Sequence, residues 1–320
     1  MSVLTTYVAV VAVKYFINGL NAPENRSAPI RADVETDDRL RLFLLGDTGT
    51  GEKMQLKVAS AMEARCRTHG VDAIVMLGDN FYPKGVVSVV DSQWQEKIFD
   101  IYNGPCLGAV PIYAVLGNHD YLSSPSAQIN AGSRYPRWNM PARYYTRTFG
   151  NVLSLVAIDT EYVDLCSNTG SCMTRFLRSE LISNKHLWRV VIGHKPLKSA
   201  NFKKSFSVSS WLLSKFICGS ADFYISGHSH HLEHRIGGGC KTGIFVSGGG
   251  GNGSYEINTK DKNVKFVKSE NGFLELEATS LTIAFRFFRF DGKKLYVTKS
   301  TKPPESAIVD TRSDLPILIQ

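Results

Sequence analysis

The sequence of 320 residues lacks several features that define large classes of proteins. Its N-terminal apolar stretch, residues 3–20, is broken by Lys14, so the uninterrupted part is too short to indicate a membrane-spanning helix. No run of basic residues is interleaved with aromatic ones in the way that a groove for nucleic acid would require. The sequence has no internal repeat, and its low-complexity content is confined to the glycines at 248–251. We therefore expect neither nucleic-acid binding nor a repeat architecture.

The N-terminal residues are consistent with more than one role. Residues 3–20 resemble a secretory signal with Ala22 as a cleavage position, but no basic residue precedes them, and an ordinary tail or an interfacial helix fits as well. The glycosylation acceptors Asn25 and Asn252 agree with secretion. We expect the secretory pathway, with the protein extracellular or in a lysosome-like or periplasmic compartment. Association with a membrane through the N-terminus is the alternative.

Length and composition favour one main domain. A chain of this length buries a substantial core, and an α/β or layered β architecture of this size often remains one domain. We expect residues 1–38 to form the signal or anchor segment and a linker, residues 39–303 the main domain, and residues 304–320 a tail. The formal net charge of +8 suits an acidic ligand, although solvated surface lysines give the same charge.

The six cysteines permit up to three disulfides without establishing any pairing. Cys166 and Cys172 bracket a short polar turn, so a local bridge is expected there in an oxidising compartment. Cys66 lies in a helical pattern and Cys218 just before a strand, and we interpret both as buried small apolar residues rather than reactive thiols.

Short apolar runs rich in β-branched residues alternate with loops and helical stretches, a pattern that predicts an α/β fold with buried strands. A helix is predicted over Lys53 to His69, with Gly70 available to end it. The C-terminal part changes to successive antiparallel strands over 273–278, 281–288 and 294–299. The earlier strands are predicted over 41–45, 73–77, 112–116, 152–158, 188–192, 223–226 and 243–246.

Polar residues follow five of these strands. Gly46-Asp47 follows the first, Gly78-Asp79 the second and Gly117-Asn118-His119 the third, while Gly193-His194 and Gly227-His228-Ser229-His230 follow two later ones. The carboxyl ends of parallel strands gather along one edge of a sheet, which is the usual place for a ligand crevice. We therefore expect these side chains to converge.

The converging residues, together with Tyr82 in the loop after Asp79, offer the donors of a metal site. Carboxylates, imidazoles and a phenol suit hard or borderline cations, and no thiolate occurs among them. Seven donors are too many for one tetrahedral ion, and they suit two ions that share a carboxylate. Each motif alone is more typical of a turn, a polar surface or a core aromatic, but five of them at strand ends make coincidence improbable. The predicted ligands are Asp47, Asp79, Tyr82, Asn118, His194, His228 and His230.

This series of motifs resembles that of the metallophosphoesterases, and Tyr82, three residues after Asp79, resembles the purple acid phosphatases. The segments 126–129, 137–141 and 247–252 are similar to the small type 5, or tartrate-resistant, class of that family. The resemblance covers residues 40–298. It implies a four-layer α/β/β/α sandwich of two mixed β-sheets flanked by helices, with residues 39–303 as the catalytic domain.

The resemblance also implies the metals and the reaction. Fe(III) would be bound by Asp47, Tyr82 and His230, and a divalent ion (Fe, Zn or Mn) by Asn118, His194 and His228. Asp79 would bridge the two ions. The implied enzyme is an acid phosphatase, a metal-dependent hydrolase of phosphate monoesters. A phosphodiesterase or a pyrophosphatase on the same metals is a second enzymatic interpretation.

Residues next to the predicted ligands are candidates for contacts with substrate. His119 follows a ligand, and we assign it to substrate binding or general acid catalysis, with a role in orienting a ligand as the alternative. The class usually has another active-site histidine after Gly193-His194-Lys195-Pro196, but residues 197–204 contain none, and Lys203 stands near that position. A lysine can bind phosphate but is a poor proton donor at acid pH, and a solvated basic loop explains the lysines equally well.

A non-enzymatic function is also open. Some relatives of this fold resemble phosphatases but serve as attachment proteins in a parasite's motility machinery, and the apolar N-terminus and the missing histidine are compatible with such a membrane-associated anchoring or scaffold protein. Those relatives tend to lose metal ligands, whereas all seven are present here. Residues 126–138 would form a lid over the pocket if the class resemblance extends that far.

Overall fold

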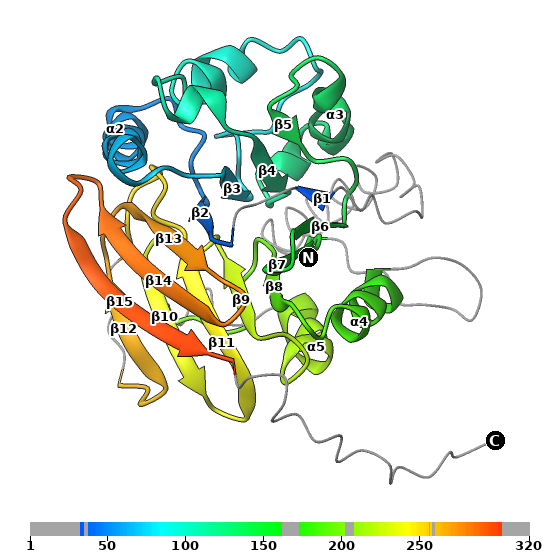
Figure 1. Cartoon of the computed structure of the whole chain (residues 1–320). Helices are drawn as coiled ribbons and strands as arrows, with labels where there is room; N and C mark the ends of the chain where they lie inside the picture. Colours follow the sequence, from blue (N-terminus) through cyan, green and yellow to red (C-terminus); the bar gives the residue numbers. More distant parts are fainter. Residues whose placement is uncertain are drawn as a thin grey trace, which may run out of the picture.

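Two β-sheets pack face to face, with helices on their outer sides (Figure 1). The computed structural model describes residues 33–34, 38–161, 173–201, 208–255, 257 and 260–302. Both sheets are mixed, containing a run of parallel strands and an antiparallel part. The prediction of a four-layer α/β/β/α architecture is therefore confirmed.

The seven-stranded sheet contains the first three predicted strands. Its strands β2, β3, β4 and β5 run parallel, and the antiparallel strands β13, β14 and β15 extend the sheet beyond β2. In spatial order the strands are β15 (Lys294–Thr301), β14 (Thr282–Arg289), β13 (Gly272–Ala278), β2 (Leu40–Leu45), β3 (Ala73–Leu77), β4 (Ile112–Val115) and β5 (Trp138–Asn139).

The eight-stranded sheet contains the four strands predicted over 152–158, 188–192, 223–226 and 243–246. Its central strands β7, β8, β9 and β11 are parallel, and the predicted bounds of these strands lie within three residues of the observed ones. In spatial order the strands are β1 (Asp33–Val34), β6 (Tyr145–Phe149), β7 (Leu153–Ala157), β8 (Trp188–Ile192), β9 (Phe223–Ser226), β11 (Cys240–Ser247), β10 (Leu232–Gly237) and β12 (Val264–Lys268).

The helices cover the outer faces of the two sheets. Helix α2 (Lys53–His69) packs on the seven-stranded sheet, where Arg65 forms an ion pair with Glu275 of β13 at 2.6 Å. Helices α4 (Met173–Ser183) and α5 (Val208–Ile217) pack on the eight-stranded sheet through a separate core. The short helices are α3 (Pro125–Asn130), a π-helical turn Gln95–Phe99 and the 3-10 turns Leu107–Ala109, Asp120–Leu122 and Ala131–Ser133.

Aromatic side chains fill the space between the sheets. The Phe285 ring of β14 lies 4.6 Å from the Phe223 ring of β9 and 4.2 Å from the Phe245 ring of β11, measured between centroids. Neighbouring positions on the same strands, such as Tyr224 and Ile244, face α4 and α5 instead. Alternate side chains therefore enter different cores, which explains why these strands read as continuous apolar runs.

The structure corrects the interpretation of two cysteines. Cys66, expected to be a small core residue, is bonded to Cys106, and Cys218 is bonded to Cys240. Cys66 is buried as predicted, but the pairing depends on partners 40 and 22 residues away that no local pattern reveals. Two disulfides agree with the expected oxidising compartment.

Several predictions fall on residues outside the described ranges. They concern the N-terminal segment with Asn25, the bridge between Cys166 and Cys172, the substrate-binding role of Lys203, and the C-terminal tail 304–320. No helix within the described ranges is both long enough and apolar enough to cross a bilayer.

Removing the Cys66–Cys106 disulfide should destabilise the fold. The bond closes a loop of 40 residues, and the chain-entropy relation gives about 4 kcal/mol for a loop of this length. Urea unfolding of Cys66→Ala/Cys106→Ala should show this loss, and Cys218→Ala/Cys240→Ala, with a separation of 22, should lose about 3 kcal/mol. Unchanged midpoints in both double variants would contradict the assignment of structural disulfides.

Candidate metal centre

Three of the predicted ligands have left-handed backbone conformations. The φ angles are +60° at Asp47, +52° at Asp79 and +66° at His228, a region that residues with a Cβ atom rarely adopt. Each of these residues comes directly after a glycine at the end of a parallel strand. The sharp turn directs the side chain back across the strand ends, and such strain persists where the surrounding structure enforces it, typically at functional sites.

Glycines allow the motif loops to approach one another. A Cβ atom at Gly78 would lie 2.6 Å from Nδ1 of His194, and a Cβ atom at Gly117 would lie 2.2 Å from the backbone nitrogen of Asp79. Neither position has room for a side chain. The glycines that the sequence places before Asp79 and Asn118 are therefore required for packing between loops.

Asp47, Tyr82 and His230 form one compact group. The Tyr82 hydroxyl donates to Oδ1 of Asp47 at 3.0 Å, and Nε2 of His230 lies 3.2 Å from the same oxygen. The Tyr82 hydroxyl and His230 Nε2 are 3.4 Å apart. The other carboxylate oxygen of Asp47 accepts a bond of 2.7 Å from the backbone nitrogen of His228, which fixes its orientation. These three residues are the ones that the family resemblance assigns to one ion.

Asn118, His194 and His228 form a second group. Nε2 of His194 lies 3.3 Å from Oδ1 of Asn118 and 3.2 Å from Nδ1 of His228. His194 donates from Nδ1 to the backbone carbonyl of Leu77 at 2.8 Å. This bond orients the ring so that Nε2 faces the other donors, an arrangement typical of histidines that ligate metals.

Asp79 lies between the two groups. Its Oδ2 accepts from the Tyr82 hydroxyl at 2.8 Å and is 3.4 Å from Nε2 of His194. Its Oδ1 accepts from the backbone nitrogen of His119 at 2.7 Å. Ligand atoms of Asp79, His194 and His228 all lie within 4.8 Å of one another. One carboxylate oxygen thus faces donors of both groups, as a bridging ligand must.

The pKa shifts of the clustered residues indicate that the site favours a bound positive charge. Burial would raise the pKa of the Asp79 carboxyl, but His194 and His119 together outweigh this effect and hold that pKa well below its usual range. Burial would lower the pKa of His194, but the carboxylates of Asp79, Asp47 and Glu161 together raise it to about 10. Burial, Asp47 and Asp79 all raise the pKa of the Tyr82 phenol well above its usual range.

The donor set fits two cations. In the protein alone, the raised pKa of His194 favours a protonated ring that offsets part of the carboxylate charge, and the neutral Tyr82 phenol lies within hydrogen-bond distance of Asp47 and Asp79. Cations would replace these protons, since metal binding requires neutral imidazoles and favours an ionised phenol. The seven predicted residues therefore form a single cluster with two sets of donors and a shared carboxylate.

His119 lies at the rim of this cluster and is half-buried. Its ring packs on the Tyr82 ring at a centroid distance of 4.5 Å, and its Nδ1 donates to the Pro83 carbonyl at 2.8 Å. This leaves Nε2 as the ring nitrogen without a protein partner among the described residues. The position is compatible with a contact to substrate.

Three residues at the site escaped the sequence reasoning. The Tyr255 ring stacks on His230, with centroids 4.4 Å apart and planes 10° apart, and the Asn252 side chain hydrogen-bonds the Tyr82 hydroxyl. A glycan on Asn252 would have to displace that bond. Buried Asp120 accepts from the backbone nitrogens of Asn80 and Gly117, tying two motif loops together. The only sequence feature that could have indicated a site role for Tyr255 is its position just after the glycine-rich loop, which is a weak signal.

Comparison with known proteins agrees with this geometry. A family model described as calcineurin-like phosphoesterase matches residues 40–232. The chain belongs to the calcineurin-like phosphoesterase family. Membership in this family, with the purple acid phosphatases among its relatives, implies a phosphoesterase with a binuclear metal centre, and the resemblance inferred from the motifs is confirmed.

The relatives of this calcineurin-like phosphoesterase include both enzymes and an anchor protein. Tartrate-resistant acid phosphatase type 5 of Sus scrofa is 29% identical over 301 residues, covering 81% of this chain and 86% of that relative. Purple acid phosphatase 7 of Arabidopsis thaliana is 28% identical, covering 90% and 94%. The solved structure of GAP50, the anchor in the inner membrane complex of Plasmodium, has a TM-score of 0.72 and 25% identity, covering 84% and 90%.

A side chain at position 78 should disrupt this phosphoesterase site. Gly78→Ala places a methyl group against His194 and also forces alanine to a φ of +86°, which by itself costs about 1–2 kcal/mol. Gly219→Ala is the matched control, because its φ is +81° and nothing lies within 4 Å of the added atom. Both variants should lose stability in urea unfolding, but only Gly78→Ala should lower the metal content per chain. Equal metal content in both would contradict the proposed contact.

Proposed function

We propose that this calcineurin-like phosphoesterase is an acid phosphatase that hydrolyses phosphate monoesters at a binuclear Fe(III)–M(II) centre. The supporting observation is the position of Asp79 Oδ2, which contacts the Tyr82 hydroxyl on one side and His194 on the other. When bound, two cations lower the pKa of a water molecule and neutralise phosphate oxygens, which is the chemistry that ester hydrolysis needs.

The proposed ligand assignment follows the two groups of donors. Asp47, Tyr82 and His230 would hold Fe(III), because a phenolate and a carboxylate favour a hard trivalent ion. Asn118, His194 and His228 would hold the divalent ion, either Fe, Zn or Mn. Asp79 would serve both. The catalytic domain would span residues 39–303 and be secreted or delivered to a lysosome-like compartment, in agreement with the two disulfides.

The remaining residues would act on the substrate. His119 is held by the Pro83 carbonyl and by the Tyr82 ring, so its Nε2 can donate a hydrogen bond to a phosphate oxygen or a proton to the departing alcohol. We propose Lys203 as a further phosphate-binding residue. Because a lysine is a weak acid, substrates with good leaving groups should be hydrolysed faster than alkyl phosphates.

Loss of a proposed ligand should abolish turnover. His194→Ala should lower kcat for p-nitrophenyl phosphate by at least about 1000-fold, because it opens the divalent site and leaves Asp79 without its partner. His186→Ala removes an exposed histidine that precedes β8, at the opposite end of that strand from His194, and should leave kcat unchanged. Metal analysis and a visible spectrum of both variants would check the cause, since a phenolate–iron band should remain in His186→Ala. A fully active His194→Ala would refute the proposal.

Tyr255 should support His230. Its ring covers the His230 imidazole, and removal of such a supporting partner typically lowers metal affinity 10- to 100-fold. Tyr255→Ala should therefore weaken metal binding by roughly tenfold or more and bleach the phenolate–iron band. Tyr255→Phe preserves the stacked ring and should keep the band. Equal loss in both variants would instead assign the effect to the hydroxyl group.

An anchoring function is the second candidate, and the likeness to Plasmodium GAP50 favours it. The presence of all seven donors in one cluster favours the enzyme instead. Comparing turnover of monoesters, diesters and pyrophosphate by metal-replete protein separates the interpretations. Normal metal content with no turnover of any ester would support the anchor.

A further inference from the structure

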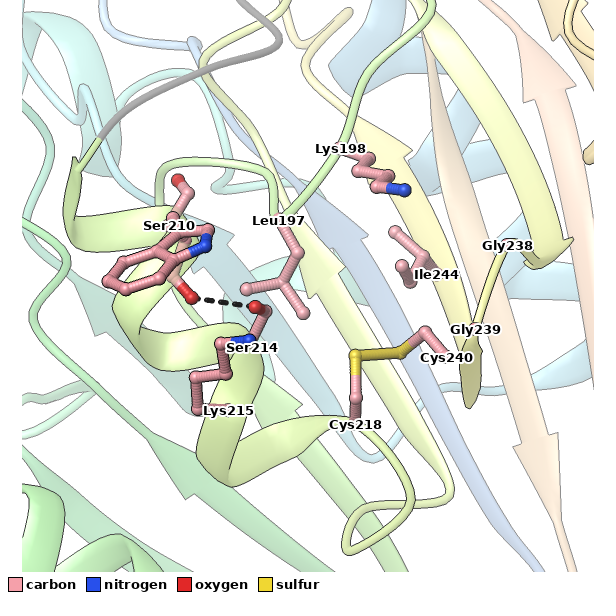
Figure 2. Close-up of a pocket in the computed structure, with 11 residues that line it drawn as sticks. Leu197, Lys198, Ser210, Ser214, Lys215, Cys218, Gly238, Gly239, Cys240 and Ile244 are labelled. Atoms are coloured by element: carbon pink, nitrogen blue, oxygen red, sulfur yellow. Dashed lines mark hydrogen bonds between the residues drawn. A yellow bond between two sulfur atoms is a disulfide. The ribbon is translucent and has the colours of Figure 1, made fainter.

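A cavity lies on the outer side of the eight-stranded sheet, away from the metal centre. Its volume is about 440 Å³, within the range of sites that hold drug-sized molecules. Helix α5, the β10–β11 hairpin and the segment after His194 surround it (Figure 2). The lining residues are Leu197, Lys198, Trp211, Lys215, Ile244 and the Cys218–Cys240 disulfide, with serines of α5 and hairpin glycines.

The cavity has an apolar floor. Leu197 and Ile244 are buried, and the Cys218–Cys240 disulfide joins the end of α5 to the start of β11 at its base. The Trp211 side chain, by contrast, is 55% exposed, whereas the other three tryptophans are at most 4% exposed. An aromatic side chain this exposed beside a cavity offers a surface on which an apolar ligand can lie.

Two lysines supply charge at the rim. Lys198 and Lys215 are exposed and lie on opposite sides of Leu197 in the view of Figure 2. The Lys215 ammonium lies 5.3 Å from the centroid of the Trp211 ring. Neither ammonium pairs with a carboxylate among the described residues. The described lining contains no acidic residue. The cavity therefore combines an apolar interior with uncompensated positive charge.

The cavity is separate from the metal centre. Cys240 at its base begins β11, and Ser247, at the other end of that strand, hydrogen-bonds Gly46 beside the metal centre. Seven residues of strand span about 23 Å. Ile244 faces α5 and the cavity, whereas its neighbour Phe245 faces the opposite sheet. A ligand in the cavity would therefore not touch the proposed metal ligands.

We propose that this cavity binds an amphipathic anion. The apolar body of the ligand would lie on Leu197, Ile244 and the face of Trp211, and its carboxylate would pair with Lys198 or Lys215 at the rim. Pairing with an ammonium that has no carboxylate partner adds an attraction that a neutral or cationic molecule of the same shape lacks. A fatty carboxylate has this chemistry.

Tryptophan emission of the whole protein reports on this site. Dodecanoate, kept below its aggregation concentration, should shift the emission to shorter wavelength in a saturable manner, because Trp211 is the exposed tryptophan. Dodecyltrimethylammonium has the same chain with the opposite charge and should bind at least about tenfold more weakly. Trp211→Phe should lose the optical signal but retain dodecanoate binding in equilibrium dialysis.

Lysine variants test whether the positive charge at the rim of the cavity holds the carboxylate of the ligand. Lys198→Gln or Lys215→Gln should weaken dodecanoate binding by roughly three- to tenfold, and the affected variant identifies the lysine that holds the carboxylate. Lys294→Gln, an exposed lysine of β15, is the matched control and should bind like the unmodified protein. Unchanged affinity in both lysine variants, or equal binding of the cationic amphiphile, would overturn the proposal. Binding to phosphatidylserine vesicles without binding to monomeric dodecanoate would overturn it as well.

Discussion

The contact of the Asp79 carboxylate with Tyr82 and His194 is the constraint on which the site depends. Asp79 is fully enclosed, and its backbone adopts a left-handed conformation directly after Gly78. Strands β2, β3 and β4 end side by side and leave their loops at one edge, where the neighbouring loops hold this conformation in place. The placement of the metal donors therefore depends on both the pairing of the strands and the glycines that follow them.

Burying two carboxylates so close together is costly unless they are compensated. Removing a charge from water costs several kcal/mol even after relaxation, so Asp47 and Asp79 need donors on every oxygen. Backbone nitrogens of His228 and His119 satisfy one oxygen of each carboxylate. The remaining oxygens face Tyr82, His194 and His230, which is the side from which cations would bind.

Much of the fold could be predicted from the sequence because its central strands are buried on both faces. Such strands read as largely apolar runs, and their bounds and the loops after them follow directly. Strands β10 and β12 could not be predicted, because they carry Glu233, Arg235 and several lysines. Glu233 and Arg235 are buried as an ion pair, and Asp261 pairs with Arg235 from another part of the chain. Only the tertiary structure provides these partners.

The candidate site was predicted to a similar extent and for a similar reason. The seven donors could be predicted because residue types that bind metals follow the ends of strands. Tyr255 could not, because it lies in a loop without a regular sequence pattern and reaches His230 only in the folded structure. The disulfide partners could not be predicted either, because only the folded structure brings Cys106 close to Cys66 and Cys240 close to Cys218.

The position of β13 has a consequence for how the protein is made. Strand β2, which leads to Asp47, pairs on one side with β13, so Leu44 lies opposite Leu274. During synthesis Leu44 leaves the ribosome 230 residues before Leu274, its partner on β13. Contacts between such distant segments form slowly. The nascent chain must therefore keep the unpaired, apolar edge of β2 soluble until β13 has been synthesised, and an exposed strand edge of this kind is prone to aggregation.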